Sequence, residues 1–219
     1  MGRAALAAAR AAFDGRAFFV GVRRLEQDGT WRGPREAVCA LVEEADLAGL
    51  GGLPAAQHAG ANTVLCSLAS AAPREALTLA LRCLVRVPFT AGEALAARKA
   101  RLEQASELLR RYPAMDGIVP TPLDEALGLD TIQFFAACRL ACPSGHVVVD
   151  LERLGHKLGQ LCLSFGADEI LGPIVNQRAL RLGAHASSNE ITRDEAVLLL
   201  RASGFVPCER LPEGKVQAL

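Results

Sequence analysis

The sequence predicts an α/β protein built on a parallel sheet. Strand-like apolar runs alternate with amphipathic helical segments about six times in 219 residues, and strand–helix–strand units with right-handed crossovers produce parallel strands. We expect an incomplete or compacted barrel of the TIM-type (β/α) class. An open doubly wound sheet is the alternative, because two of the eight strands of a full barrel are not visible. Residues 1–219 are expected to form a single domain, since a chain of this length can bury one sizeable core.

The first strands and helices follow from apolar patterning. Residues 4–13 are rich in alanine, which favours a helix, and residues 17–22 form an apolar run typical of a buried strand. After a turn-rich loop over 27–34, apolar side chains recur at helical spacing, so residues 35–47 are expected to be a helix. A second strand is expected over 62–68.

The middle of the chain continues the alternation. Pro73 opens a short helix over 74–80, and a third strand over 83–89 is expected to end near Pro88. The longest helix should cover 92–112, with leucines on an inner stripe. A fourth strand begins at Asp116, and two prolines should turn it into an open loop after Val119.

The last third contains helices and two further strands. A helix capped near Asp130 is expected over 130–141, a fifth strand over 146–151, a short helical or turn segment over 154–159 and a sixth strand over 161–165. Beyond Pro173 we expect a helix over 176–182, a polar loop over 183–189 and a helix over 193–202. Thr192 and Glu195 form a capping box for the last helix. Gly204 ends this helix, and an extended tail follows over 205–210.

The composition excludes several classes of partner. The 24 basic and 24 acidic residues cancel, so no overall field attracts nucleic acid or an anionic membrane. No apolar run approaches the roughly 20 residues that span a bilayer. The alanine-rich N-terminus has too short an apolar core for a signal peptide. We therefore expect a cytoplasmic protein with no nucleic-acid or membrane partner, and most of the seven cysteines reduced and buried.

The stretch 158–173 is the first candidate site. An apolar run over 161–165 is followed by Gly166, which permits a turn, and by the adjacent carboxylates of Asp168 and Glu169. In a parallel α/β fold, acidic residues just past the carboxyl end of a strand lie where ligands bind. The alternative is that one of the two carboxylates caps the next helix.

Several segments carry motifs of one enzyme family. The longest is Gly155-His-Lys-Leu-Gly-Gln-Leu-Cys-Leu-Ser-Phe-Gly-Ala-Asp-Glu169, and shorter ones are Gly92-Glu93-Ala94 followed by Arg98, Ala136 to Leu140, and Leu200 to Arg210. On these motifs, residues 87–216 resemble the C-terminal half of the radical S-adenosylmethionine (SAM) enzymes of the futalosine route to menaquinone. Those enzymes are aminofutalosine synthase and cyclic dehypoxanthine futalosine cyclase, and the deazaflavin synthase subunits are related. Residues 1–86 diverge from the family.

The departures from the family concern its cofactors. The resemblance implies a four-iron cluster and SAM, but the Cys-x3-Cys-x2-Cys loop that holds the cluster is missing here. No cofactor and no metal site are therefore expected. Cys138 and Cys142 are close in sequence, but we expect them to lie one turn apart on a helix end. The family's Gly-Thr-x-x-Glu-Glu is also replaced, by Gly172-Pro-Ile-Val-Asn-Gln177.

Two functions follow from the resemblance and its departures. The first is a degenerate homologue, a pseudoenzyme that acts as an auxiliary subunit or metabolite-binding protein in menaquinone biosynthesis. Its partners would be a small-molecule metabolite and either a paralogous radical SAM subunit or a second copy of this chain. The alternative is an active enzyme with non-radical acid–base chemistry on a nucleoside-like or chorismate-derived metabolite.

Candidate site residues are those placed at expected strand ends or carried by the motifs. We expect them to converge on one rim of the barrel, with an arginine offsetting the carboxylates and one carboxyl pKa raised. A barrel short of strands would also leave two open sheet edges for a helix, the tail or a partner to cover. The catalytic candidates are Glu93, Asp168 and Glu169, and the ligand-binding candidates are Arg98, Thr121, Arg139, Asp150, Gly166, Asp168 and Glu169.

Overall fold

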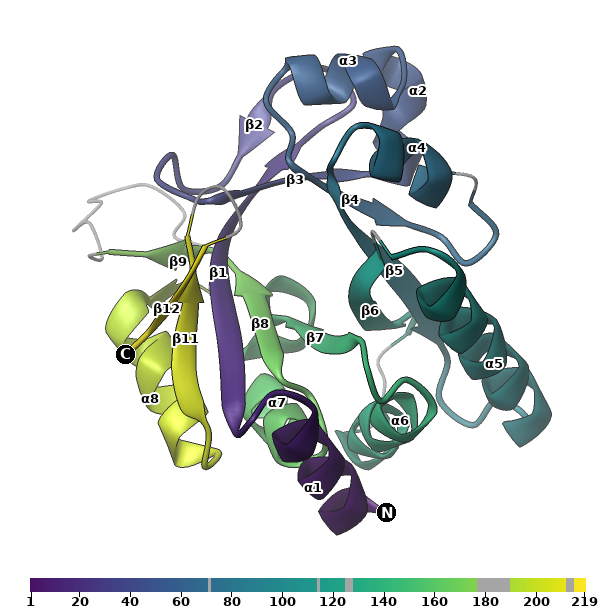
Figure 1. The fold of residues 1–219 in the computed structure, drawn as a ribbon, viewed down its shortest axis with the longest axis vertical. Coiled ribbons are helices and arrows are strands. Elements are labelled where there is room, and N and C mark those ends of the chain that lie inside the picture. The colour runs from purple at the N-terminus through teal and green to yellow at the C-terminus, as the bar shows by residue number, and fades with distance from the viewer. Residues whose placement is uncertain (71, 114, 125–127, 177–189, 212–214) are drawn as a thin grey trace.

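The computed structural model describes residues 1–70, 72–113, 115–124, 128–176, 190–211 and 215–219. Within this part of the chain, seven parallel strands close into a TIM-type barrel, which confirms the expected fold class (Figure 1). Closure comes from the pairing of the first barrel strand with the last, from Phe18 opposite Glu169 to Gly21 opposite Gly172. In barrel order the strands are β1 (Arg16–Leu25), β3 (Cys39–Glu43), β4 (Thr63–Cys66), β5 (Arg82–Phe89), β6 (Met115–Pro122), β7 (His146–Asp150) and β8 (Glu169–Gly172).

Strand β1 organises the sheet because it pairs with three parallel strands. Its first half pairs with β8 and with β11 (Val206–Arg210), and its second half pairs with β3. Figure 1 shows β1 running between β11 and β8. The expectation of two open barrel edges was therefore wrong, because β1 bonds both β3 and β8. The tail expected over 205–210 is the strand β11, which extends the sheet outside the barrel and pairs in turn with β12 (Val216–Ala218).

Two short pairings complete the strands of the described residues. β2 (Trp31–Arg32) folds back antiparallel on the end of β1. β9 (Ile174–Val175) pairs with β10 (Ile191–Thr192).

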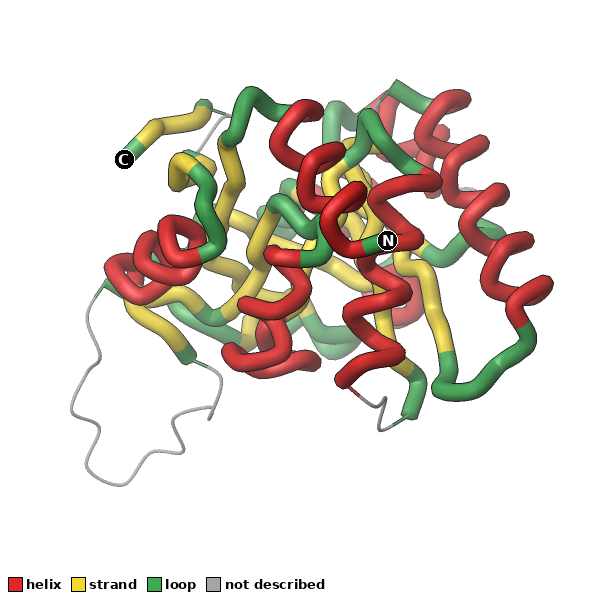
Figure 2. The backbone as a smooth tube through the Cα atoms, turned by 90° about the horizontal axis from the view of Figure 1, so that it is seen from below, coloured by secondary structure: helices red, strands yellow, loops and turns green. Residues whose placement is uncertain are grey.

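The helices surround the strands (Figure 2). Helix α1 packs against α6 and α7, so the N-terminal helix covers the end of the barrel where the strands begin (Figure 1). In chain order the helices are α1 (Gly2–Ala12), the 3-10 turn η1 (Glu44–Asp46), α2 (Leu47–Leu50), α3 (Leu53–His58), α4 (Ala72–Thr78), α5 (Leu95–Arg111), α6 (Gly128–Ala141), α7 (Leu151–Ser164) and α8 (Arg193–Ala202).

Alternating side chains of the strands build two apolar cores. In β3, Cys39 and Leu41 point into the barrel, whereas Val42 joins the core between sheet and helices. Burying each large apolar side chain contributes about 1.5–3 kcal/mol. The interior core contains Val20, Val22, Cys39, Leu41, Leu65, Leu84, Val119, Val148 and Leu171.

The helix expected over 35–47 was wrong, because β3 occupies its centre. Residues 39–42 are all at most 3% exposed, which a strand between two cores allows and an amphipathic surface helix does not. The apolar spacing that resembled a helical stripe is part of a continuous buried run. Such short runs are ambiguous between strand and helix.

The strand expected over 161–165 was also wrong, because these residues belong to α7. Leu154, Leu158 and Cys162 recur every four residues and pack on the outer core. Gly155 has φ of 71°, which breaks the helix after its first turn. The strand that follows α7 is β8, which begins only at Glu169, so neither Asp168 nor Glu169 caps a helix.

The two prolines of β6 do not end the strand, contrary to expectation. Pro120 lies opposite Val87 and Pro122 opposite Phe89, so β6 continues through both. On its other side β6 pairs with β7 only at Gly117 and Ile118. Pro120 and Pro122 lack an N–H, but they lie beyond the stretch in which β6 pairs with β7, so no hydrogen bond between these two strands is lost.

The remaining elements lie close to their expected positions. The capping box of Thr192 and Glu195 is present on α8, and Gly204 follows the helix with φ of 79°. The helix expected over 176–182 and the loop over 183–189 lie almost entirely outside the described residues. Across the ranges that are described, no helix is long and apolar enough to cross a membrane.

Candidate functional site

Polar side chains lie at both ends of the barrel interior. Along β5 the inward row reads Arg82, Leu84 and Arg86, and along β7 its ends are His146 and Asp150. Each row thus has an apolar middle and a polar residue at either end. The barrel holds one polar cluster where its strands begin and another where they end.

The cluster at the carboxyl ends of the strands lies where TIM-type barrels bind their ligands. At its centre, Arg24 donates to Asp150 at 2.7 Å, to Glu152 at 2.9 Å and to Glu43 at 3.2 Å. We call this set of ion-paired side chains the rim cluster; it consists of Arg24, Glu43, Arg86, Asp150, Glu152 and Arg153.

The start of α7 positions two members of the rim cluster. The Asp150 carboxylate caps the helix by accepting from the Glu152 backbone N–H at 3.1 Å. The turn that follows carries Arg153, and Gly155 then redirects the chain. A single carboxylate thereby fixes the helix start and pairs with Arg24.

The charged side chains of the rim cluster shift one another's pKa values. Burial opposes the charge on Arg24, but Asp150, Glu152 and Glu43 together raise the pKa of its guanidinium above the usual value. Burial would raise the pKa of Glu43, but Arg86, Arg24 and Arg153 lower it below its ordinary range. Both groups therefore stay charged at neutral pH.

Two arginines of the rim cluster retain donors for a ligand. Arg86 donates one bond to Glu43 at 2.5 Å, and its buried Nε has no partner among the described residues. The Arg153 side chain is 42% exposed, and its nitrogens lie 3.5 Å from Glu43 and 3.6 Å from Asp150. These are long contacts. The Arg86 Nε is buried, so an anion at the rim would reach Arg153 and the terminal nitrogens of the 25% exposed Arg86 side chain.

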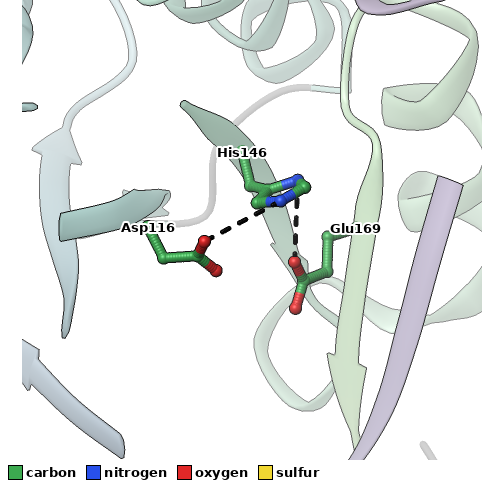
Figure 3. A group of neighbouring side chains, drawn as sticks. All are labelled: Asp116, His146 and Glu169. Atoms are coloured by element: carbon green, nitrogen blue, oxygen red, sulfur yellow. Dashed lines mark ion pairs between the residues drawn. The ribbon is translucent and has the colours of Figure 1, made fainter. Parts of the chain in front are cut away.

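The cluster at the opposite end contains the group Asp116, His146 and Glu169 (Figure 3). A His146 ring nitrogen lies 3.9 Å from Asp116 and the other lies 3.8 Å from Glu169. Both carboxylates are already bonded by Arg82 and Arg210, with separations of 2.6–3.2 Å. A divalent cation would have to displace two guanidinium groups, so we assign no metal to this base cluster, which comprises Arg82, Asp116, His146, Glu169 and Arg210.

Glu169 is the most strongly perturbed carboxyl of the base cluster. Complete burial would raise its pKa, but Arg82 and Arg210, with His146, lower the pKa to about 2. It is a fixed anion and a very weak base.

Asp168 forms a separate buried ion pair next to the base cluster. It pairs with Arg139, and neither side chain is exposed. Its carboxylate also accepts from the Val147 backbone N–H at 2.8 Å and bonds His146. The pair joins α6 to the start of β8.

The candidate residues do not converge on one rim, contrary to expectation. Asp150 belongs to the rim cluster, and Thr121 ends β6 on the same side, where its hydroxyl donates to the Val119 carbonyl. Asp168 and Glu169 lie at the opposite end, since their strand begins there instead of ending there. Their roles in ligand binding remain predictions, as do those of Gly166 and Arg139, which also lie there.

Glu93 and Arg98 lie in a third network, outside the barrel. Arg98 bonds Asp130 at 2.5 Å and Glu93 at 3.2 Å, and Arg101 also pairs with Glu93. Burial would raise the pKa of Glu93, but Arg101 and Arg98 lower it. Neither Glu93 nor Glu169 has the raised pKa that we expected of one carboxyl.

The thiols do not fit a cluster held by three cysteines. In the N-terminal half, Cys39, Cys66 and Cys83 are buried in three neighbouring strands, and only the Cys66 and Cys83 sulfurs of the described residues are in contact, at 3.2 Å. Burial raises the pKa of Cys138 well above its usual value and that of Cys142 to about 11, which disfavours the thiolates that bind metal. Among the described residues, the one group of three or more potential metal ligands within reach of each other contains no cysteine.

The sequence reasoning missed five of the six residues of the rim cluster, all except Asp150. Arg24, Glu43 and Arg86 each follow an inward apolar residue by two positions, which is the period of a strand. This alternation was a usable signal for β1 and β5. The same alternation in β3 was overlooked, because that segment was predicted to be a helix.

The comparisons with known proteins concern the fold. No family model and no curated protein sequence matches this chain. The solved structure of methylornithine synthase (PylB) matches with a TM-score of 0.64 and 12% identity, over 94% of this chain and 88% of that one. HydG, a maturase of the FeFe-hydrogenase, matches with a TM-score of 0.59 and 11% identity, over 94% of this chain and 67% of that one. Both are radical SAM enzymes, and this chain has their barrel fold.

Proposed function

We propose that this protein binds an anionic metabolite at the rim cluster and performs no radical chemistry. The observation that carries the proposal is the pair of arginines, Arg86 and Arg153, whose donors are only partly used at the ligand-binding end of a TIM-type barrel. A metabolite carboxylate or phosphate would accept from both. The charges of the rim cluster cancel, so the attraction is local hydrogen bonding and not a net field.

The proposed cellular role is that of an auxiliary subunit or metabolite-binding protein in menaquinone biosynthesis by the futalosine route. The resemblance of residues 155–169 to the enzymes of that route supports the pathway, and the radical SAM barrel fold is compatible with it. The missing cysteine loop supports a role without a cluster. A catalytic paralogue would then supply the radical chemistry.

Binding can be tested by titration calorimetry with chorismate, which carries two carboxylates, and with adenosine as an uncharged nucleoside. We expect chorismate to bind and Arg86→Ala to weaken binding at least about tenfold, the loss of one charge-assisted bond. Arg74→Ala is the control, because this exposed arginine lies on α4, outside the rim cluster. Failure of both probes to bind, or equal binding by Arg86→Ala, would reject the rim site.

The pathway and the absence of a cluster need separate tests. Cells lacking the gene should contain less menaquinone, and the Arg86→Ala protein should not restore it. Protein treated anaerobically with iron and sulfide should retain no stoichiometric iron. A stable cluster that is lost on Cys138→Ala would contradict the cluster-free role.

A second candidate function, non-radical acid–base chemistry on a nucleoside-like or chorismate-derived metabolite, is favoured by Asp46. Burial, with the nearby charges of Glu43 and Glu26, raises the pKa of this carboxyl above its usual value, which is the direction that favours a general acid. Turnover of chorismate that Asp46→Asn abolishes without weakening binding would establish it. Binding without turnover in the unmodified protein would exclude chorismate as its substrate.

A further inference from the structure

A groove of about 820 Å³ runs along the outside of the barrel between α5 and α6. One wall follows α5 from Leu95 to Arg110, and the other is formed by α6 from Gln133 to Ala141, with Met1 beside them. Sixteen residues of helix at about 1.5 Å each correspond to a groove of roughly 22–24 Å. The α5 wall is long enough for four turns of another helix, and the α6 wall, nine residues from Gln133 to Ala141, flanks about half of that length.

The floor of the groove is apolar. Leu102 and Phe134 are buried beneath it, and the small side chains of Ala137 and Ala141 line the α6 wall. At one end, Leu95 is 81% exposed although it lies beside this floor. An exposed leucine that continues an apolar groove is typical of a protein-binding surface.

The outer flank of α5 carries four exposed charges in the order basic, acidic, acidic, basic. Lys99 pairs with Glu103 at 3.6 Å, and Glu107 pairs with Arg110, and all four side chains are 54–77% exposed. The order reads the same in both directions. A second copy of α5, laid antiparallel along the whole groove, would therefore place Lys99 opposite Arg110 and Glu103 opposite Glu107. Like charges would face each other in that arrangement.

We propose that this groove receives an amphipathic helix of a different protein. Its apolar face would carry large side chains at i, i+4 and i+7, as in other helix-in-groove complexes. Its flank would carry the complementary order, acidic, basic, basic, acidic. The groove lies in the helix layer outside the barrel, so the proposal goes beyond metabolite binding at the rim and does not depend on it.

The test uses two synthetic helical peptides of 18 residues that share one apolar stripe. One has the acidic–basic–basic–acidic flank, and the other has every flank charge reversed. Fluorescence anisotropy at low salt should show the first binding about tenfold more tightly, and added salt should reduce that ratio. Leu95→Asp should weaken binding at least tenfold with an unchanged melting temperature. Leu198→Asp, at a leucine 62% exposed on α8, should bind normally.

Several outcomes would overturn the proposal. Equal binding of both peptides would reject the charge-selected partner, and absence of binding would reject the helix groove. Sodium dodecanoate that binds with an affinity sensitive to Leu95→Asp, where neither peptide binds, would assign the groove to a small amphiphile. A dimer dissolved by Leu95→Asp in analytical ultracentrifugation, again without peptide binding, would assign it to a second copy.

Discussion

Arg139 and Asp168 form an ion pair that is completely buried between α6 and the start of β8. The remaining N–H groups of Arg139 donate to backbone carbonyls, including those of Gly166 at 2.9 Å and Gly145 at 2.8 Å. Asp168 in turn accepts from the Val147 N–H. One pair thereby joins the connections that precede β7 and β8, so its position predicts a structural role.

Asp168→Ala should lower the free energy of unfolding by about 3–5 kcal/mol, because it leaves a buried guanidinium without its partner. Urea unfolding measures this loss. Asp194→Ala, at an exposed aspartate on α8, should change stability by less than about 1 kcal/mol. Chorismate binding by the folded variant should be unchanged, since Asp168 lies at the far end of the barrel from the rim. Lost binding at full stability would instead place Asp168 in the ligand site.

Glu169 should make the free energy of unfolding depend on pH in the acidic range. Its pKa is lowered from 4.5 to about 2 in the folded protein, so it contributes stability above pH 4.5 that is lost as the pH falls toward 2. The full contribution is about 3 kcal/mol. The difference in unfolding free energy between the unmodified protein and Glu169→Gln should shrink from pH 5 to pH 2.5. Glu107→Gln, at a 54% exposed side chain, should show no such trend. A constant difference for Glu169→Gln would disprove the linkage.

Gly166→Ala should destabilise the protein far more than Gly15→Ala. Both glycines have positive φ, 110° and 73°. An added Cβ at Gly166 would lie 2.8 Å from the Cβ of Arg139, whereas one at Gly15 meets nothing within 4 Å. We expect a loss of about 1 kcal/mol at Gly15 from backbone strain and roughly 3 kcal/mol or more at Gly166. Equal losses in thermal unfolding would show that the contact with Arg139 relaxes at little cost.

Arg24→Lys should destabilise the rim although it keeps the charge. The planar guanidinium bonds three carboxylates at once, and an ammonium on a flexible stem cannot reproduce that geometry. We expect a loss of roughly 1–3 kcal/mol in urea unfolding. Arg110→Lys is the matched control, because its side chain is 77% exposed and pairs with Glu107 at the surface of α5, away from the rim cluster. A loss no larger than the control's would mean that the rim network is redundant.

The sequence was sufficient to predict secondary structure where its local pattern favoured either a strand or a helix. The run at 17–22 was predicted as a buried strand and lies within β1, and the helix at 193–202 carries its own capping box. It was insufficient for 35–47 and 161–165, where short apolar segments satisfy both a strand and a helix pattern. Those two errors displaced the candidate site. Once α7 is extended to Ser164, Asp168 directly precedes β8 and Glu169 begins it, so both lie at the opposite end of the barrel from Asp150.

The amino-acid sequence by itself determined the class of this protein, a parallel α/β barrel, and the residue types available for its chemistry. Hydrophobic periodicity and helix caps are local properties, so they can be recognised in each segment without knowledge of the segments that pack against it. Only the tertiary structure decided which charges meet. Arg24 and Asp150 are 126 positions apart, and their contact exists because β1 and β7 both flank β8 and end on the same side of a closed barrel. Closure of the barrel fixes that register, and no local pattern in either strand encodes it.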